Sequence, residues 1–345
     1  MASACAGARP VPRRGPIGVL PPANLSGAAI PTRELRETWE KVLRQRGVQV
    51  IDPAALDAFM ARHRVRSTAG VDAEVARASA AELGIEGILV TAVELYRNQP
   101  PALAMTARLV STGPDPAIAW IDGESRTGDE SPGLFELGLI TDVHELQARV
   151  MGTLADSLRA FRDGAAPRAR ACGGGGRFAP RTAFRSRLLT RAAARSVAVL
   201  PFADETRRRG AGEVVALEML RQLEATGHFR VVEPGVVRDE LLRYRIVMDN
   251  GVSLDGARVV AELLRTDLVL AGVVRDFEEV GVPRAAFTVM LLDRASSEVL
   301  WMASAQSQGD DGVFFFDAGL VATAPALSCR MARSALETLG ATAAR

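Results

Sequence analysis

The chain of 345 residues is 48% hydrophobic and 24% charged, which is enough for about two globular domains, each with its own buried core. Its formal net charge of +1 excludes the strong basic surplus that is typical of proteins binding nucleic acid electrostatically. No apolar run reaches the roughly 18 residues of a membrane-spanning helix. We therefore expect no nucleic-acid partner and no spanning helix.

Residues 1–15 are interpreted as a flexible leader. Within it, Cys5 follows small residues and precedes a stretch that is rich in proline and arginine. This pattern resembles the end of a bacterial lipoprotein signal, although the apolar stretch of such a signal is missing from the chain as written. If the true start lies upstream, Cys5 is the lipidated residue and a membrane tether. Otherwise it is an accidental cysteine in the leader.

The sequence repeats itself at an offset of 180 to 181 residues. Residues 17–21 match residues 197–201 (197 − 17 = 180), and Trp120 matches Trp301 (301 − 120 = 181). One predicted helix in each copy carries an apolar stripe that we interpret as core-facing. The stripes are Leu35, Trp39 and Leu43 in the first copy, and Val215, Met219 and Leu223 in the second. We predict two tandem homologous domains, at residues 16–162 and 196–340.

Residues 163–195, between the two copies, are predicted to be a linker. They contain consecutive glycines at positions 173–176 and several arginines, with little apolar periodicity. We expect a flexible tether, with a short basic helix near its end as a further option. A solvated spacer is favoured over contact with anionic lipid or nucleic acid.

The second copy shows its elements more clearly than the first. Strands are predicted at residues 197–202, 229–233, 267–276, 285–293 and 298–307. Helices are predicted at residues 212–226, from Pro234 with Glu233 as a possible cap, from Ser253 or Asp255 to Leu264, and at residues 325–339. The order β-α-β-α-α-β-β-β-α indicates an α/β fold in which each copy forms a mixed β-sheet flanked by helices.

Motifs for chemistry are incomplete in this sequence. Gly210 and Gly212, at a predicted helix start, imitate a dinucleotide-binding fingerprint, but Val215 occupies the third glycine position. The one lysine, Lys41, lies inside a predicted helix, which excludes a Walker-type phosphate loop. The histidines show no metal-ligand spacing, and the cysteines lie far apart in an odd number that cannot form a complete internal disulfide set. These residues are His63, His144, His228, Cys5, Cys172 and Cys329. We expect no enzymatic activity, no cofactor and no bound metal.

An acidic and aromatic segment after the last predicted strand is the candidate protein-contact surface. It consists of Asp310, Asp311, Phe314, Phe315, Phe316 and Asp317. The carboxylates could hold calcium or form a solvated turn. The phenylalanines could form a partly exposed contact surface or pack under the last helix.

Three segments of the second copy carry a family resemblance: VAVLPFADET at 197–206, GHFRVVE at 227–233 and DLVLAG at 267–272. They resemble motifs of the CsgG/LpoB-like bacterial envelope lipoproteins, also seen in the TolB amino-terminal domain. The resemblance covers about residues 196–340 and, more faintly, 16–160. It implies a periplasmic, non-enzymatic domain that binds proteins. The short turn near Ser296 departs from the pore-forming members. Asp204 and Pro234 also depart from the family pattern, so no binding site is carried over.

Together these observations predict a non-enzymatic scaffold or activator that binds envelope proteins and could form oligomers. The expected location is the periplasmic side of the cell envelope, with an outer-membrane anchor through Cys5. The alternative function is a regulatory protein that binds a small molecule or nucleotide. The alternative location is the cytoplasm, which applies if Met1 is the true start.

Overall fold

The computed structural model describes residues 14–130, 138–165, 172–173, 176–189, 195–246, 252, 254–313 and 319–340. The first half of the chain builds one mixed sheet in the order β1-β3-β4-β5, and β2 also pairs with β3. The strands are β1 (Ile17–Val19), β2 (Ala23–Asn24), β3 (Gly87–Arg97), β4 (Ala102–Ser111) and β5 (Ile118–Thr127). The helices are α1 (Thr32–Gln45), α2 (Pro53–Arg62), α3 (Ala73–Leu83) and α4 (Val143–Arg162).

The second half builds a second mixed sheet in the order β6-β12-β11-β10-β7-β9, with β8 paired to β10. Its strands are β6 (Thr182–Arg185), β7 (Arg195–Val199), β8 (Ala203–Asp204), β9 (Phe229–Val231), β10 (Leu268–Glu278), β11 (Arg284–Asp293) and β12 (Val299–Gln308). Its helices are α5 (Ala211–Thr226), α6 (Pro234–Arg243), α7 (Leu254–Leu264) and α8 (Ala324–Gly340). The predicted α/β fold, with mixed sheets flanked by helices, is confirmed.

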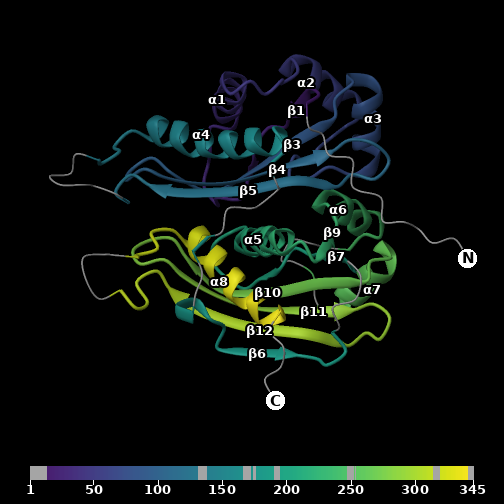
Figure 1. Ribbon diagram of the computed structural model, residues 1–345, viewed down its shortest axis with the longest axis vertical. Helices are drawn as coiled ribbons and strands as arrows, with labels where there is room; N and C mark the ends of the chain where they lie inside the picture. The colour runs from purple at the N-terminus through teal and green to yellow at the C-terminus, as the bar shows by residue number, and fades with distance from the viewer. Residues whose placement is uncertain are drawn as a thin grey trace, which may run out of the picture.

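Helices and sheets alternate in layers. Figure 1 shows α1 and α4 above the first sheet, α5 and α8 between the two sheets, and the second sheet beneath them. The predicted helix stripes face these cores: Leu35, Trp39, Leu43, Val215, Met219 and Leu223 are all 0% exposed. Buried indole groups are hydrogen-bonded, as apolar surroundings require. Trp39 Nε1 donates to Thr91 Oγ1 at 3.1 Å, and Trp301 Nε1 donates to Thr338 Oγ1 at 3.0 Å.

The two halves share details of strand pairing. Ile17 pairs with Gly87 in the first sheet, and Val197 pairs with Leu268 at the matching place in the second. Each long central strand has an irregularity at the matching point, between positions 93 and 95 and between positions 274 and 276. The strand β9 has only an isolated bridge, from Ile17 to Val50, as its counterpart. These matches favour a duplication; the domain boundaries stay predictions.

Part of the predicted linker belongs to the second sheet. Strand β6 pairs antiparallel with the edge strand β12, from Thr182 opposite Ser304 to Arg185 opposite Trp301. A 3-10 turn over Gly176–Phe178 precedes it, and Phe178 is buried at 3% exposure. Residues 176–189 are therefore an ordered edge of the sheet rather than the expected tether, because Phe178 and the pairing with β12 fix them to the body of the second half.

A disulfide fixes the start of this segment. Cys172 is bonded to Cys329 of α8, with the two Cα atoms 6.0 Å apart. The sequence spacing indicated no pairing, because the two cysteines are separated by 157 residues and meet only when the linker folds along α8. Cys5 lies outside the described residues. No helix in the described part of the chain is both long and apolar enough to span a membrane.

Candidate functional site

Helix α5 lies in the contact between the two halves. Its residues from Ala211 to Leu223 are almost all buried, on every side of the helix. Ala92, Ile118 and Ile121 of the first sheet belong to the same apolar core as α5 and the second sheet. Helices α2 and α3 cover one part of this face of the first sheet, and α5 of the other half closes the rest of it. Polar residues of both halves are buried in the same junction.

A buried ion pair crosses the junction. Arg108 of β4 and Glu233, at the start of α6, are 2% and 0% exposed. Arg108 Nε donates to Glu233 Oε2 at 3.0 Å, and Arg108 Nη2 donates to Glu233 Oε1 at 2.9 Å. Such a bidentate pair fixes the distance and the angle between its two elements. It therefore sets how α6 sits against the first sheet.

The same carboxylate also holds the backbone of both halves. Glu233 caps α6 by accepting from Gly235 N at 3.3 Å, as the sequence predicted, and it accepts from Val71 N of the first half at 3.2 Å. The loop carrying Val71 approaches so closely that a Cβ on Gly235 would lie 2.2 Å from Val71 N. Glycine at position 235 is therefore required by this approach.

A second cluster of charges is buried beside α5. Arg221 donates from Nη2 and Nε to Glu218 Oε2 at 2.6 and 2.9 Å, and its Nη1 lies 4.0 Å from Asp122 Oδ1 of β5. Its Nη1 also donates to the carbonyl oxygen of Gly123, and a Cβ on that glycine would lie 2.8 Å from Nη1. The guanidinium thus joins α5 to an edge strand of the first sheet.

Glu94 of β3 completes this cluster and is 2% exposed. Its Oε1 has no hydrogen-bond partner, and the surrounding groups are Glu218 and Arg221 of α5, Thr106 of β4 and Arg208. Burial, helped by the negative charge of Glu218, raises the pKa of Glu94 to about 8. Glu94 therefore holds a proton at neutral pH.

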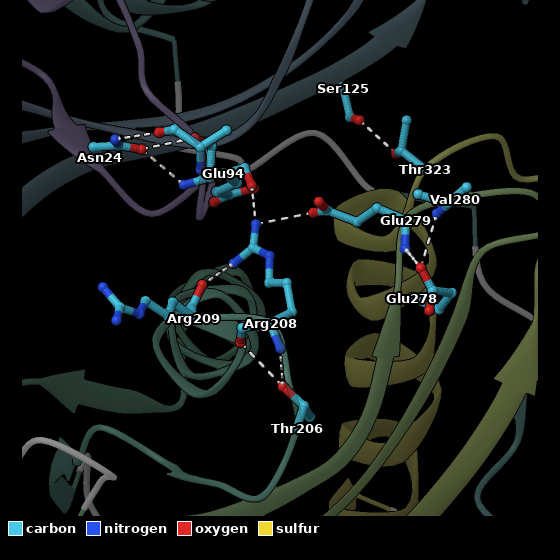
Figure 2. A network of polar contacts seen from close by, with 12 residues as sticks. Asn24, Glu94, Ser125, Thr206, Arg208, Arg209, Glu278, Glu279, Val280 and Thr323 are labelled. Atoms are coloured by element: carbon cyan, nitrogen blue, oxygen red, sulfur yellow. Dashed lines mark hydrogen bonds and ion pairs between the residues drawn. The ribbon is translucent and has the colours of Figure 1, made fainter.

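Arg208 ties the junction to the turn between β10 and β11, as Figure 2 shows. Its Nη2 donates to the backbone oxygen of Glu94, across the two halves, and to Glu279 Oε1 at 2.9 Å. The Arg208 loop is itself ordered by a side-chain turn, because Asp204 Oδ1 accepts from Thr206 N and Thr206 Oγ1 at 3.0 and 2.7 Å. Asn24 and Ser26 form the same turn in the first half.

A cavity of about 110 Å³ lies in the junction. Apolar side chains of both halves line most of it, including Leu25 and Ala92 from the first half and Leu217 and Leu220 from α5. Arg108 contributes a polar wall, and this side chain is already paired with Glu233. The cavity is thus small and mostly apolar, and Glu213 and Arg238 are its other charged lining residues.

Only the start of the candidate contact surface, at the end of β12, lies within the described residues. Phe314, Phe315, Phe316 and Asp317 are outside the described residues. Asp310 is exposed, and the half-buried Asp311 accepts from Gln308 N at 2.8 Å through Oδ2, which makes it part of a turn. Arg177 donates to the carbonyl oxygens of Gly309 and Gly319 at 2.9 and 2.8 Å, so one guanidinium holds both ends of the segment.

The helix start that imitated a nucleotide site is occupied by protein. Gly212 N donates to Asp204 Oδ2 at 3.3 Å, and a Cβ on Gly212 would lie 2.2 Å from the carbonyl oxygen of Phe202. A phosphate at this helix start would meet the carboxylate of Asp204, so the geometry does not favour the nucleotide alternative. Within the described residues, no group of three or more His, Cys, Asp or Glu side chains is placed to hold a metal ion.

Sequence reasoning missed the junction residues. Glu233 was predicted only as a helix cap, and neither Arg108 nor Glu94 was singled out. A signal was present in α5, where Glu218 and Arg221 interrupt an otherwise apolar helix, and in β3 and β4, where Glu94 and Arg108 interrupt apolar strands. Charged residues inside apolar elements indicate buried pairs.

No protein-family model matches the chain, and no curated protein sequence matches it. Among solved structures, a PelC dodecamer from Paraburkholderia phytofirmans is 17% identical, with a TM-score of 0.32, over 46% of this chain and 96% of that one. E. coli LpoB is 17% identical, with a TM-score of 0.27, over 34% and 58%. Lipoprotein GNA1162 from Neisseria meningitidis is 17% identical, with a TM-score of 0.25, over 33% and 79%. Likeness at these values carries no argument about function, and the CsgG/LpoB resemblance stays a prediction.

The buried pair predicts a large loss of stability when one partner is removed. Arg108→Met leaves the Glu233 carboxylate buried without its cation, so we expect the free energy of unfolding to fall by about 3–5 kcal/mol. Urea unfolding measures the loss.

The double variant Arg108→Met, Glu233→Gln should recover part of the lost stability, because the Gln amide oxygen can still cap α6 and carries no buried charge. The exposed pair Arg33–Glu37 is the control, and Arg33→Gln should change stability by less than about 0.5 kcal/mol. Equal losses in the Arg108 and Arg33 variants would contradict this.

Glu94 predicts how stability depends on pH. The pKa of Glu94 is raised from 4.5 to about 8 in the folded protein. The stability that comes from its protonated form is therefore fully present below pH 4.5 and is lost as pH rises towards 8. We compare the free energy of unfolding of the wild type with that of Glu94→Gln. The wild-type value minus the variant value should fall across that window, with a slope approaching about 1.4 kcal/mol per pH unit. Denaturant titrations at several pH values measure it. A difference that is flat between pH 5 and 8 would show that Glu94 is ionised in the folded protein.

Proposed function

We propose that this chain is a non-enzymatic protein of the bacterial cell envelope, held on the periplasmic side by a lipid on Cys5, where it acts as a scaffold or activator for other envelope proteins. The observation that carries the location is the disulfide between Cys172 and Cys329. Disulfides form and persist in oxidising compartments such as the bacterial periplasm and are rare in the reducing cytosol. The disulfide therefore favours export over the cytoplasmic alternative.

The candidate contact surface supports the binding role. The candidate segment follows β12, and Arg177 donates to the carbonyl oxygens of Gly309 and Gly319, which flank it. Leu320, directly after it, is 38% exposed. The exposed carboxylate of Asp310 and the exposed apolar side chain of Leu320 are a combination that protein interfaces use, with apolar anchors surrounded by a polar rim.

Fractionation of the source cells, with mass spectrometry of the mature protein, tests the location. We expect the protein in the membrane fraction, with an acylated Cys5 as its first residue and with Cys172 and Cys329 recovered as a disulfide-linked peptide pair. Cys5→Ser should release the protein from the membrane. A soluble protein that keeps Met1 or Ala2 and has both cysteines as free thiols would refute the proposed location.

Alanine substitutions test the contact surface. Phe314→Ala combined with Phe315→Ala should weaken capture of the envelope partner at least about tenfold, because buried aromatic anchors carry most of the energy of an interface. In vivo crosslinking from a photoreactive residue at position 316 measures the capture. Phe184→Ala, at a side chain that is 49% exposed on β6, is the matched control. Capture that survives the double substitution, with an unchanged circular dichroism spectrum, would remove this surface from consideration.

A further inference from the structure

A basic cleft lies at the opposite side of the first half from the junction helix, between the ends of α1 and α4. It has a volume of about 450 Å³ and is lined by residues 45–49, at the end of α1, by the end of α4 and by the first described residue of the chain. Its charged lining residues are Arg14, Arg46, Arg159, Arg162 and Asp163. Arginines therefore outnumber carboxylates in the lining by four to one.

Arg162 shows that the cleft is more than a set of exposed arginines. The residue is 7% exposed, and its Nη2 donates to the carbonyl oxygen of Gly15 at 2.7 Å. Its Nη1 is buried and has no hydrogen-bond partner. A buried guanidinium N–H group without a hydrogen bond costs free energy. An anion in the cleft would accept a hydrogen bond from it.

The other arginines are only partly neutralised. Arg46 Nε donates to Asp156 Oδ1 at 3.0 Å, and Arg159 Nε lies 3.5 Å from Asp163 Oδ2, in pairs whose carboxylates are 65% and 69% exposed. Each of these guanidinium groups has further N–H donors besides the one in its ion pair. Arg14 is exposed. The cleft thus combines one fixed donor with three adaptable ones.

Helix ends and neighbouring carboxylates offset part of the arginine charge in the cleft. The C-terminus of a helix carries about half a negative charge, so α1 and α4 together contribute about −1. The last carbonyls are already bonded: Leu43 O accepts from Arg46 N at 3.0 Å, and Arg159 O accepts from Asp163 N at 2.9 Å. Four guanidinium groups are set against the carboxylates of Asp156, Asp163 and Glu86 and against the two helix ends, so the cleft is distinguished by its guanidinium donors and not by a large net charge.

We propose that this cleft binds the phosphate group of an anionic ligand, with Arg162 as the fixed donor and Arg14, Arg46 and Arg159 closing on the same group. Guanidinium groups match phosphate oxygens in pairs of parallel hydrogen bonds, which lysine cannot make. The phosphate can belong to an anionic lipid headgroup or to a soluble phosphate ester. The site goes beyond the proposed scaffold role, and it does not require that Cys5 be lipidated.

The test uses the full chain with Cys5→Ser, so that any membrane binding reports the cleft and not a lipid anchor. Inorganic phosphate is titrated by calorimetry, and flotation is measured with vesicles of phosphatidylcholine and with an equimolar mixture of phosphatidylcholine and phosphatidylglycerol. We expect binding in at least one arm. Arg159→Gln should weaken it about fivefold, the effect of one arginine near an anionic surface. Arg149→Gln, which removes the same charge from an exposed pair about three turns earlier on α4, should leave it unchanged.

Each outcome decides the proposal. Binding of phosphate without flotation assigns the site to soluble phosphate esters, and flotation that needs phosphatidylglycerol and Arg159 assigns it to a lipid headgroup. Arg46→Gln repeats the test from the end of α1 and leaves the buried Arg162 in place. No binding in either arm overturns the proposal, as does an equal loss in the Arg159 and Arg149 variants. A protein that is not lipidated in cells but binds phosphate here would refute the anchor and keep the cleft.

Discussion

The arrangement of the two halves depends on α5, a helix that is buried on all sides. In α1, Glu34 and Glu37 face solvent, and this is the polar side that a surface helix keeps. The matching positions of α5 hold Val214 and Leu217, which are 0% and 7% exposed. A helix with no polar side must be covered twice, so the second sheet alone cannot complete its packing. The first sheet supplies the other cover, and the two halves become one body.

Apolar contact would hold α5 against the first sheet but would permit several placements. The buried charges restrict the choice, because any placement that separates Arg108 from Glu233, or Arg221 of α5 from Asp122 of β5, takes a buried charge away from its partner in the other half. We interpret these pairs as determinants of position more than as sources of stability. Glu94 is protonated for a related reason. The one positive charge of Arg221 cannot neutralise all of the carboxylates around it.

Local patterns were enough to predict the elements of the second half, because its strands are apolar runs and its helices begin at recognisable caps such as Glu233. The same patterns failed for the segment around Phe178, where β6 forms only because β12 offers an unpaired edge. They also could not pair Cys172 with Cys329 or Arg108 with Glu233. Those contacts join residues more than a hundred positions apart, and nothing in the sequence near either partner specifies the other.

The two sheets differ in what covers their equivalent faces. Because of this difference, a further unit cannot be added through the same contact that joins the two halves. In the second sheet, the face equivalent to the one that α5 covers lies over β10 and β11. Met290 stands there at the position of Arg108, and Arg275 stands at the position of Glu94. Thr288 and Arg275 on that face are open or half-open to solvent. Neither the apolar helix nor the matching charges of the internal contact recur there, and α1 presents Glu34 and Glu37 outward. A head-to-tail contact that could repeat would build an open filament. Here the internal contact is not repeated at either end, since one end presents the charged side of α1 and the other the open face of the second sheet with Arg275 and Thr288.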